Sequence, residues 1–182
     1  CINFYMLKDY LSSITKVANN INEVALNKAI KAIDKAINNN KNIFICGNGG
    51  SASLSDHALC DWTKRLYPKK KCRVFDLTSN KSLISAISND INHNDIFSFQ
   101  LDVYSERSDI CIFISSSGNS KNIINGMKFA KKKKLKIIGI LGFNGGKAMK
   151  LADIPIHCKT STYEHHEDLA QIIMHYIYLK LK

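Results

Sequence analysis

The sequence predicts a three-layer α/β/α sandwich, in which helices cover both faces of a five-stranded parallel sheet. Short runs of continuously apolar residues alternate with longer segments of helical periodicity, which is typical of a sheet buried on both faces. Two loops built almost wholly of small residues, 47–51 and 115–120, directly follow such apolar runs. A length of 182 residues suits one domain, spanning 1–182, with a full core.

Residues 1–40 are expected to form two helices ahead of the sheet. Apolar residues recur at helical spacing from Phe4 to Asn40, and the pattern breaks near Asn19 and Asn20. The first helix carries more apolar surface than packing on one sheet face requires. We therefore expect it to form part of an oligomer interface, with an ordinary core helix as the alternative.

Five apolar runs are the expected strands, and ligands should bind beyond their carboxyl ends. The runs span residues 42–46, 72–77, 109–114, 135–141 and 154–158. Helices are expected after the loop 47–51, over 80–88, through Phe97 to Val103, over 121–133, after the turn 142–146, and from about 163 to the end. A break is expected at 88–90, where serine, asparagine and aspartate follow one another.

The chain is basic, with 26 lysines and arginines against 15 acids and a formal charge of +11. Much of the excess lies in the lysine runs 69–71 and 131–134. No aromatic-rich strand or recognition-helix pattern accompanies these lysines, so we expect no nucleic-acid partner. No signal peptide is evident and no apolar run approaches the roughly 18 residues of a membrane span. These features favour a cytoplasmic protein without a membrane partner.

The six cysteines are expected to be free thiols rather than disulfides. Cys46, Cys111 and Cys158 fall inside apolar runs, and the sequence contains no C-x-x-C pair.

The two small-residue loops are candidate phosphate sites. Glycines in 47–51 let the backbone approach an anion, and Ser51 adds a hydroxyl beside the unpaired N–H groups of a helix start. The second loop, SSSGNS at 115–120, offers four serines, although a plain helix-capping turn would account for one of them. Neither loop fits a Walker or a dinucleotide motif, which favours a sugar phosphate over a nucleotide.

Histidines and carboxylates recur at helical spacing in two segments. His57 and Asp61 stand four residues apart, and Glu167, Gln171 and His175 repeat this spacing. Two such helices could hold a zinc-like dication or act as a general acid/base pair, and surface ion pairs are the alternative.

The remaining four histidines offer less. His165 and His166 are adjacent and face different ways, so at most one of them could join such a site. His93 and His157 have no partner visible in the sequence and are expected to be structural.

These motifs resemble the sugar-isomerase (SIS) domain family, and within it the phosphoheptose isomerases. The resemblance covers nearly the whole chain. It rests on CGNGGSA at 46–52, a histidine six residues after Ser51, SAISND at 85–90 followed by IFS, SSSGNS at 115–120, and a last helix that carries a histidine near its end. It implies a flavodoxin-like SIS domain and a homo-oligomer, with tetramers and sites between subunits as in the family.

The resemblance also implies roles for individual residues. Those matching substrate-binding positions, for phosphate or sugar, are Asn48, Gly49, Gly50, Ser51, Asp90, Ser115, Ser116, Ser117, Ser120 and Glu164. Those matching the metal site are His57, Asp61, Glu167 and His175, and the last three also carry the catalytic roles. The family pattern is usually histidine, glutamate, glutamine, histidine, so Asp61 and Glu167 depart from it. The implied cofactor is one Zn²⁺ per subunit, or another divalent ion.

The implied reaction converts sedoheptulose 7-phosphate to D-glycero-D-manno-heptose 7-phosphate through an enediol. It would supply heptose for lipopolysaccharide or capsule. An isomerase of another sugar phosphate is one alternative, because both departures lie where the reacting end of the sugar would be. A non-catalytic SIS protein that binds a sugar phosphate for regulation is the other.

Overall fold

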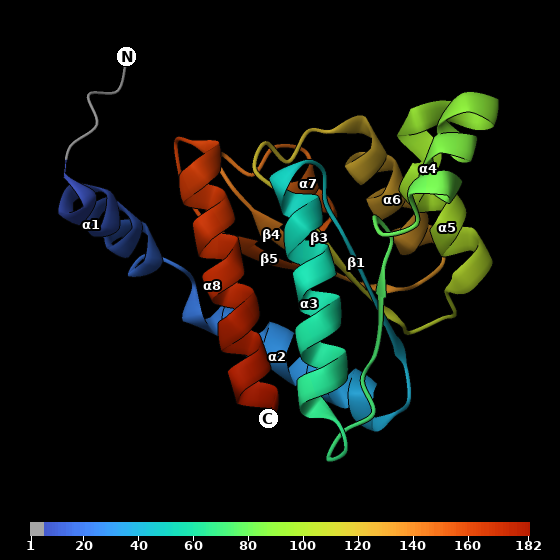
Figure 1. Cartoon of the computed structure of the whole chain (residues 1–182), viewed down its shortest axis with the longest axis horizontal. Helices are drawn as coiled ribbons and strands as arrows, with labels where there is room; N and C mark the ends of the chain where they lie inside the picture. The colour runs from blue at the N-terminus through green and yellow to red at the C-terminus, as the bar shows by residue number, and fades with distance from the viewer. Residues whose placement is uncertain (1–5) are drawn as a thin grey trace.

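The structure, a computed structural model, describes residues 6–182 (Figure 1). One parallel sheet has the strand order β2-β1-β3-β4-β5. The strands are β1 Asn42–Cys46, β2 Arg73–Asp76, β3 Ile110–Ser115, β4 Lys136–Leu141 and β5 Ile154–His157. The predicted α/β architecture with a five-stranded parallel sheet is confirmed, with strand ends within one residue of the predicted ones.

Helices connect the strands as the periodicity predicts. Their bounds are α1 Leu7–Ala18, α2 Glu23–Asn38, α3 Gly50–Leu66, α4 Lys81–Ile87, α5 Ile96–Tyr104, α6 Lys121–Lys132, α7 Ala148–Leu151 and α8 Tyr163–Leu181. The predicted break near Asn19 and Asn20 separates α1 from α2. The expected start of the first helix at Phe4 lies outside the described residues.

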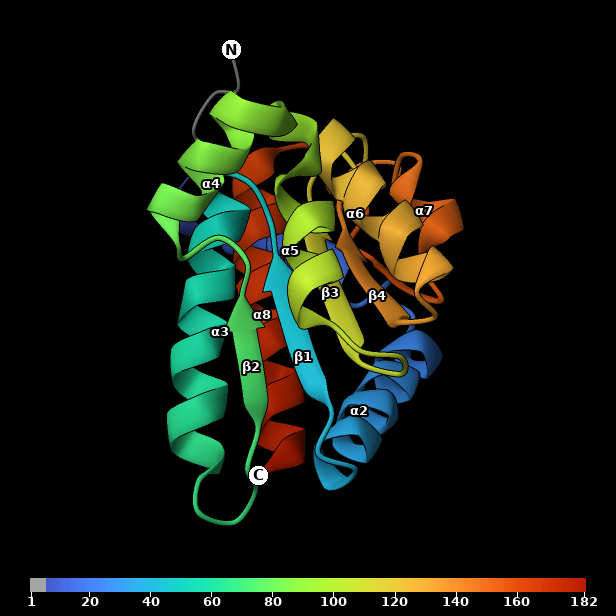
Figure 2. The same ribbon diagram turned by 90° about the vertical axis from the view of Figure 1, so that its right-hand side faces the viewer.

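The core forms two layers, one on each face of the sheet, because successive side chains of a strand point to opposite faces. In β1, Ile43 and Ile45 pack with α2, α3 and α8, whereas Phe44 and Cys46 pack with α5 and α6. Figure 2 shows α3 and α8 on one side of the sheet and α5 and α6 on the other. These neighbours explain why β1, β3 and β4 are apolar at nearly every position.

Two expectations need correction. β2 is not buried throughout: it is an edge strand whose exposure alternates, and Phe75 is 43% exposed. The predicted break at 88–90 is a π-helical turn over Ser88–Asn92, followed by a 3-10 turn over His93–Asp95 that leads into α5. The helix therefore widens there instead of ending.

The first helix lies beside α8 and extends away from the sheet (Figure 1). The Tyr10 hydroxyl donates to Asp168 Oδ2 at 2.7 Å, and that carboxylate raises the pKa of Tyr10 to about 12. Leu7 and Leu11 are more than half exposed, while Ile14 is buried. An apolar face of α1 thus remains uncovered in the single chain.

Five of the six cysteines lie in the described part of the chain, and all five are free thiols. Burial raises the pKa of the Cys46 and Cys111 thiols well above their ordinary value, which keeps them protonated. Among residues 6–182, no helix has the length and apolar character needed to cross a membrane.

Candidate functional site

Both small-residue loops lie at the carboxyl edge of the sheet, because they follow neighbouring strands. β1 and β3 run parallel in register, with Cys46 opposite Phe113, so the loops leave the sheet side by side. The side-chain amides of Asn48 and Asn122 donate to each other, each at 2.9 Å. This reciprocal pair ties the first loop to the start of α6.

The serine loop is folded on itself and on the next loop. Ser115 Oγ accepts from the Gly118 N–H at 3.1 Å, and Ser117 Oγ accepts from the Asn119 N–H at 3.2 Å. Gly118 has a φ of +61°, and a Cβ there would lie 2.1 Å from the carbonyl oxygen of Gly145. A glycine is therefore required where the two loops meet.

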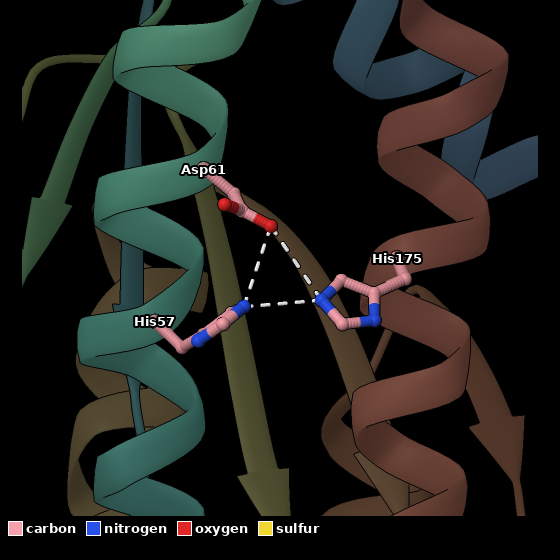
Figure 3. Close-up of side chains that lie close together, drawn as sticks. All are labelled: His57, Asp61 and His175. Atoms are coloured by element: carbon pink, nitrogen blue, oxygen red, sulfur yellow. Dashed lines mark hydrogen bonds and ion pairs between the residues drawn. The ribbon is translucent and has the colours of Figure 1, made fainter.

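Helices α3 and α8 bring three predicted ligands together (Figure 3). The Nε2 atoms of His57 and His175 are 3.1 Å apart. Asp61 Oδ2 lies 3.3 Å from His57 Nε2 and 3.5 Å from His175 Nε2. Asp61 is buried between two half-exposed imidazoles, so the three donors face one point from two elements far apart in sequence.

The donor set fits a zinc-like ion. Tetrahedral bonds of about 2.0–2.1 Å place neighbouring nitrogen and oxygen donors about 3.3 Å apart. The three observed separations, 3.1, 3.3 and 3.5 Å, scatter around that value. Two imidazoles and a carboxylate are also donors that zinc accepts.

Two further side chains complete this cluster. Arg65 Nε donates to Asp61 Oδ1 at 3.1 Å, which leaves Oδ2 directed at the histidines. The Gln171 amide lies 2.8 Å from His175 Nε2, and a half-turn of the amide would direct its oxygen there instead. The sequence placed Gln171 on the same helical face as His175, but the resemblance directed attention to Glu167.

Glu167 lies outside the group of three, two turns before His175 on α8. A Cβ on Gly50 would come within 2.3 Å of its carboxyl group, so this carboxylate sits against the start of α3. Burial, followed by the charges of Glu164 and Asp168, raises the pKa of Glu167. Its role as a metal ligand stays a prediction.

The other residues that were predicted to bind substrate differ in how deeply they are buried. Ser51, Ser115 and Ser116 are buried at the two loops. Asp90 is exposed in the π-helical turn, where it accepts from Asn89 Nδ2 at 2.7 Å. Glu164 is exposed in the first turn of α8, and its carboxylate makes no hydrogen bond or ion pair within residues 6–182. Substrate binding by Asp90 and Glu164 stays a prediction.

The remaining histidines lie apart from the group formed by His57, Asp61 and His175. His165 Nε2 contacts Ser13 Oγ at 3.0 Å and joins α8 to α1. His166 is fully buried against Gly142 without a partner for either ring nitrogen, and burial lowers its pKa to about 4. His93, expected to be structural, reaches Asn122 Nδ2 at 3.5 Å and so borders the amide pair of the loops.

Comparison with known proteins identifies the family. The SIS domain model matches residues 8–142. This chain belongs to the SIS domain family. Among its curated relatives, the phosphoheptose isomerase of Aliarcobacter butzleri (strain RM4018) is 35% identical over 153 residues, which cover 82% of this chain and 80% of the relative. That of Buchnera aphidicola subsp. Acyrthosiphon pisum is 36% identical over 157 residues, covering 84% and 78%.

Solved structures show the SIS fold. Phosphoheptose isomerase GmhA from Neisseria gonorrhoeae superposes with a TM-score of 0.89 at 23% identity, covering 96% of each chain. This agreement extends beyond the part matched by the SIS model to include α8, which supplies His175.

Proposed function

We propose that this SIS-family chain is a metal-dependent aldose–ketose isomerase that converts sedoheptulose 7-phosphate to D-glycero-D-manno-heptose 7-phosphate. The observation that carries the proposal is the convergence of His57, Asp61 and His175 from α3 and α8, in a chain whose serine loop is suited to a phosphate. The curated relatives, which are named phosphoheptose isomerases, support this choice of substrate.

The serine loop would hold the phosphate. Its hydroxyls and backbone N–H groups, with the start of α6, offer donors without a fixed cation, which suits a ligand that must be released. The Glu167 carboxylate against Gly50 would repel a phosphate from the start of α3. With its phosphate at the serine loop, the sugar would extend its C1 and C2 toward α3 and α8.

His57, Asp61 and His175 would hold the ion, with Gln171 as the fourth side chain. A bound dication, Zn²⁺ in our proposal, supplies Lewis-acid polarisation of the C1 and C2 oxygens. Arg65 keeps Asp61 Oδ2 directed at the site.

Glu167 is the better proton carrier of the two carboxylates. Both Asp61 oxygens are engaged, one with Arg65 and one with the histidines, whereas Glu167 makes no ion pair within the described chain. A raised pKa suits a group that must take and return a proton near neutrality. Glu167 would take the proton from C1 and return it to C2 of the enediol, and a proton would pass between the two sugar oxygens, for which His175 remains a candidate.

The test follows sedoheptulose 7-phosphate by NMR in deuterated water with the zinc-loaded protein. We expect formation of the aldose and exchange of the C1 protons with solvent. Exchange without conversion to this heptose would point to another sugar phosphate. If the ketose phosphate binds but neither exchanges nor converts, the isomerase proposal is wrong and a binding or regulatory role replaces it.

Two variants divide the roles in this mechanism. His175→Ala should lower turnover roughly a thousandfold while sparing phosphate binding, because it removes one of the side chains proposed to hold the ion. His165→Ala on the same helix is the control and should retain turnover. Glu167→Gln should suppress C1 exchange with the zinc content unchanged, whereas loss of zinc would make Glu167 a ligand instead.

We also propose a homo-oligomer, assembled as a tetramer through the apolar face of α1. Leu7 and Leu11 are 72% and 52% exposed, although they lie on the same helix as buried Ile14. Light scattering should give four times the chain mass for the native protein. A paired Leu7→Lys and Leu11→Lys variant should lower that mass, and an unchanged mass would remove α1 from the interface.

A further inference from the structure

The opposite edge of the sheet carries a hollow that the proposed reaction does not use. It has a volume of about 630 Å³ and lies between the carboxyl ends of α2 and α6 and the starts of β3 and β4. Because a six-residue strand is about 20 Å long, β3 separates this hollow at its start from the serine loop at its end by that distance.

Lysines dominate the lining of the hollow. Five of them face it, together with a single acidic residue, Asp153. These lysines are Lys35, Lys41, Lys131, Lys134 and Lys136. They come from α2, from the α2–β1 turn, from the end of α6 and from the start of β4, so distant parts of the sequence assemble one basic surface.

Most of this charge lacks a partner. Lys41 is 4.0 Å from Glu106, and Lys136 is 3.8 Å from Asp153. Lys35, Lys131 and Lys134 form no ion pair within residues 6–182. The two helix ends supply only about half a negative charge each, so an excess of about two positive charges remains.

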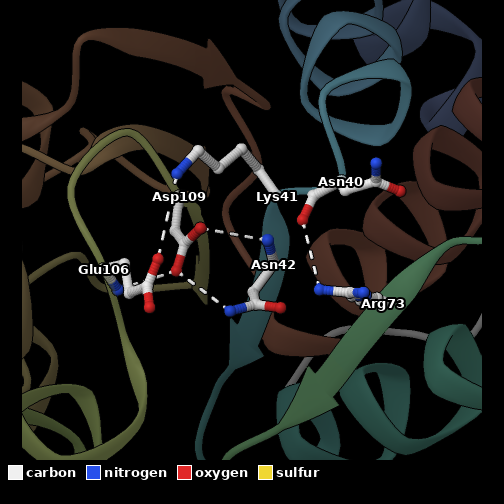
Figure 4. A network of polar contacts seen from close by, with 6 residues as sticks. All are labelled: Asn40, Lys41, Asn42, Arg73, Glu106 and Asp109. Carbon is white, nitrogen blue, oxygen red and sulfur yellow. Dashed lines mark hydrogen bonds and ion pairs between the residues drawn. The ribbon is translucent and has the colours of Figure 1, made fainter.

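The wall around Lys41 is held in place by hydrogen bonds (Figure 4). Asp109 accepts from the backbone N–H of Asn42 at 3.0 Å and from the Asn42 side chain at 3.2 Å. Its other contact, from the Glu106 N–H at 2.8 Å, closes the turn before β3. The hollow is therefore formed before any ligand arrives.

Two lining residues adopt a backbone conformation that favours glycine. Lys134 has a φ of +61° and Ser108 a φ of +73°, and the Ser108 N–H donates to the Lys134 carbonyl at 3.3 Å. A helix usually ends on glycine at the position of Lys134. A side chain in this conformation strains the backbone, and that of Lys134 adds one ammonium group to the hollow.

The lining also limits the kind of ligand. It contains no aromatic side chain on which a base could stack, and it offers ammonium groups from several directions. We propose that this hollow is an anion site for a small ligand with two or more phosphate groups. Lysines on opposite walls would each contact a different phosphate group, and a monophosphate has only one such group.

The experiment titrates sodium tripolyphosphate into the full chain by calorimetry, with orthophosphate as the comparison. We expect tripolyphosphate to bind more tightly than orthophosphate, and its affinity to fall with added salt. The double variant Lys131→Gln and Lys134→Gly should weaken binding about tenfold or more. The control Lys16→Gln on α1 should leave the affinity unchanged.

Several results would overturn the proposal. One is that tripolyphosphate does not bind. Another is that its binding is unaffected by the double variant but abolished by excess sedoheptulose 7-phosphate, which would place it at the serine loop. A third is that a short single-stranded DNA binds through the same lysines while tripolyphosphate does not. None depends on turnover, so this site and the isomerase proposal can fail separately.

Discussion

The two edges of the sheet differ in which residues carry the left-handed backbone. At the amino edge, β1, β3 and β4 are each preceded by a non-glycine residue with positive φ, namely Asn40, Ser108 and Lys134. At the carboxyl edge the same strands are followed by glycines with positive φ: Gly49, Gly118, and Gly145 with Gly146. Phe143 is the exception at that edge.

This difference shows what each edge must accommodate. At the carboxyl edge, backbone approaches backbone closely, as at Gly118 and Gly145, and we propose that a phosphate approaches there too. A side chain would fill that space. At the amino edge the turns that join helices to strands keep their side chains, and that of Lys134 carries a charge. The following predictions test this contrast, beginning with the largest expected change in stability.

Gly118→Ala should destabilise the protein by about 3 kcal/mol, measured by urea unfolding. Its Cβ would lie 2.1 Å from the Gly145 carbonyl oxygen, and the φ of +61° disfavours any side chain. Backbone cannot rotate away as a side chain can. A loss below about 0.5 kcal/mol would contradict the requirement for glycine at this edge.

His166, beneath the carboxyl edge, should make stability depend on pH. Burial lowers its pKa from 6.5 to about 4. Between these two pH values His166 is protonated in the unfolded chain but not in the folded chain. Stability should therefore fall as the pH drops from about 6.5 to about 4, by about 3 kcal/mol in total. Urea unfolding at pH 7 and pH 4 measures this loss.

The matched variant is His166→Leu, which removes the titrating ring while keeping the site apolar. Its loss of stability over the same pH range should be smaller than that of the native protein. Equal losses would show that His166 is not responsible and that other groups control the acid response.

Lys134→Gly should stabilise the protein by roughly 0.5–1 kcal/mol, since glycine adopts the left-handed conformation without strain. Lys132→Gly, two residues earlier and still inside α6, should have the opposite sign. Thermal unfolding of both variants provides the comparison. If both lose stability equally, the backbone at Lys134 carries no strain worth relieving.

Gly50→Ala should change stability least, by less than about 0.5 kcal/mol, although its Cβ would meet Glu167 at 2.3 Å. The neighbour is the end of a flexible side chain, which can move aside. Turnover should nevertheless fall, because we propose that this carboxylate carries the proton. Unchanged turnover alongside unchanged stability would argue against Glu167 in that role.

The sequence by itself determined the strands, most helices and both small-residue loops. Continuous apolar runs such as 110–114 can be buried on two faces only between helices, and parallel strands bring their following loops to one edge. The pair His57 and Asp61 could also be predicted from the sequence, because a spacing of four residues places both on one helical face. These properties are local or follow from chain order.

Only the tertiary structure decided which residues of α8 meet that pair. Glu167, Gln171 and His175 share one helical face, so periodicity cannot choose among them. The position of α8 along α3 places His175 and Gln171 at the histidine–aspartate cluster and Glu167 at Gly50. Likewise, exposure of β2 follows from its place at the sheet edge, and the lysine hollow exists because separate helices end together. Such distances depend on packing between elements, which no spacing within one element encodes.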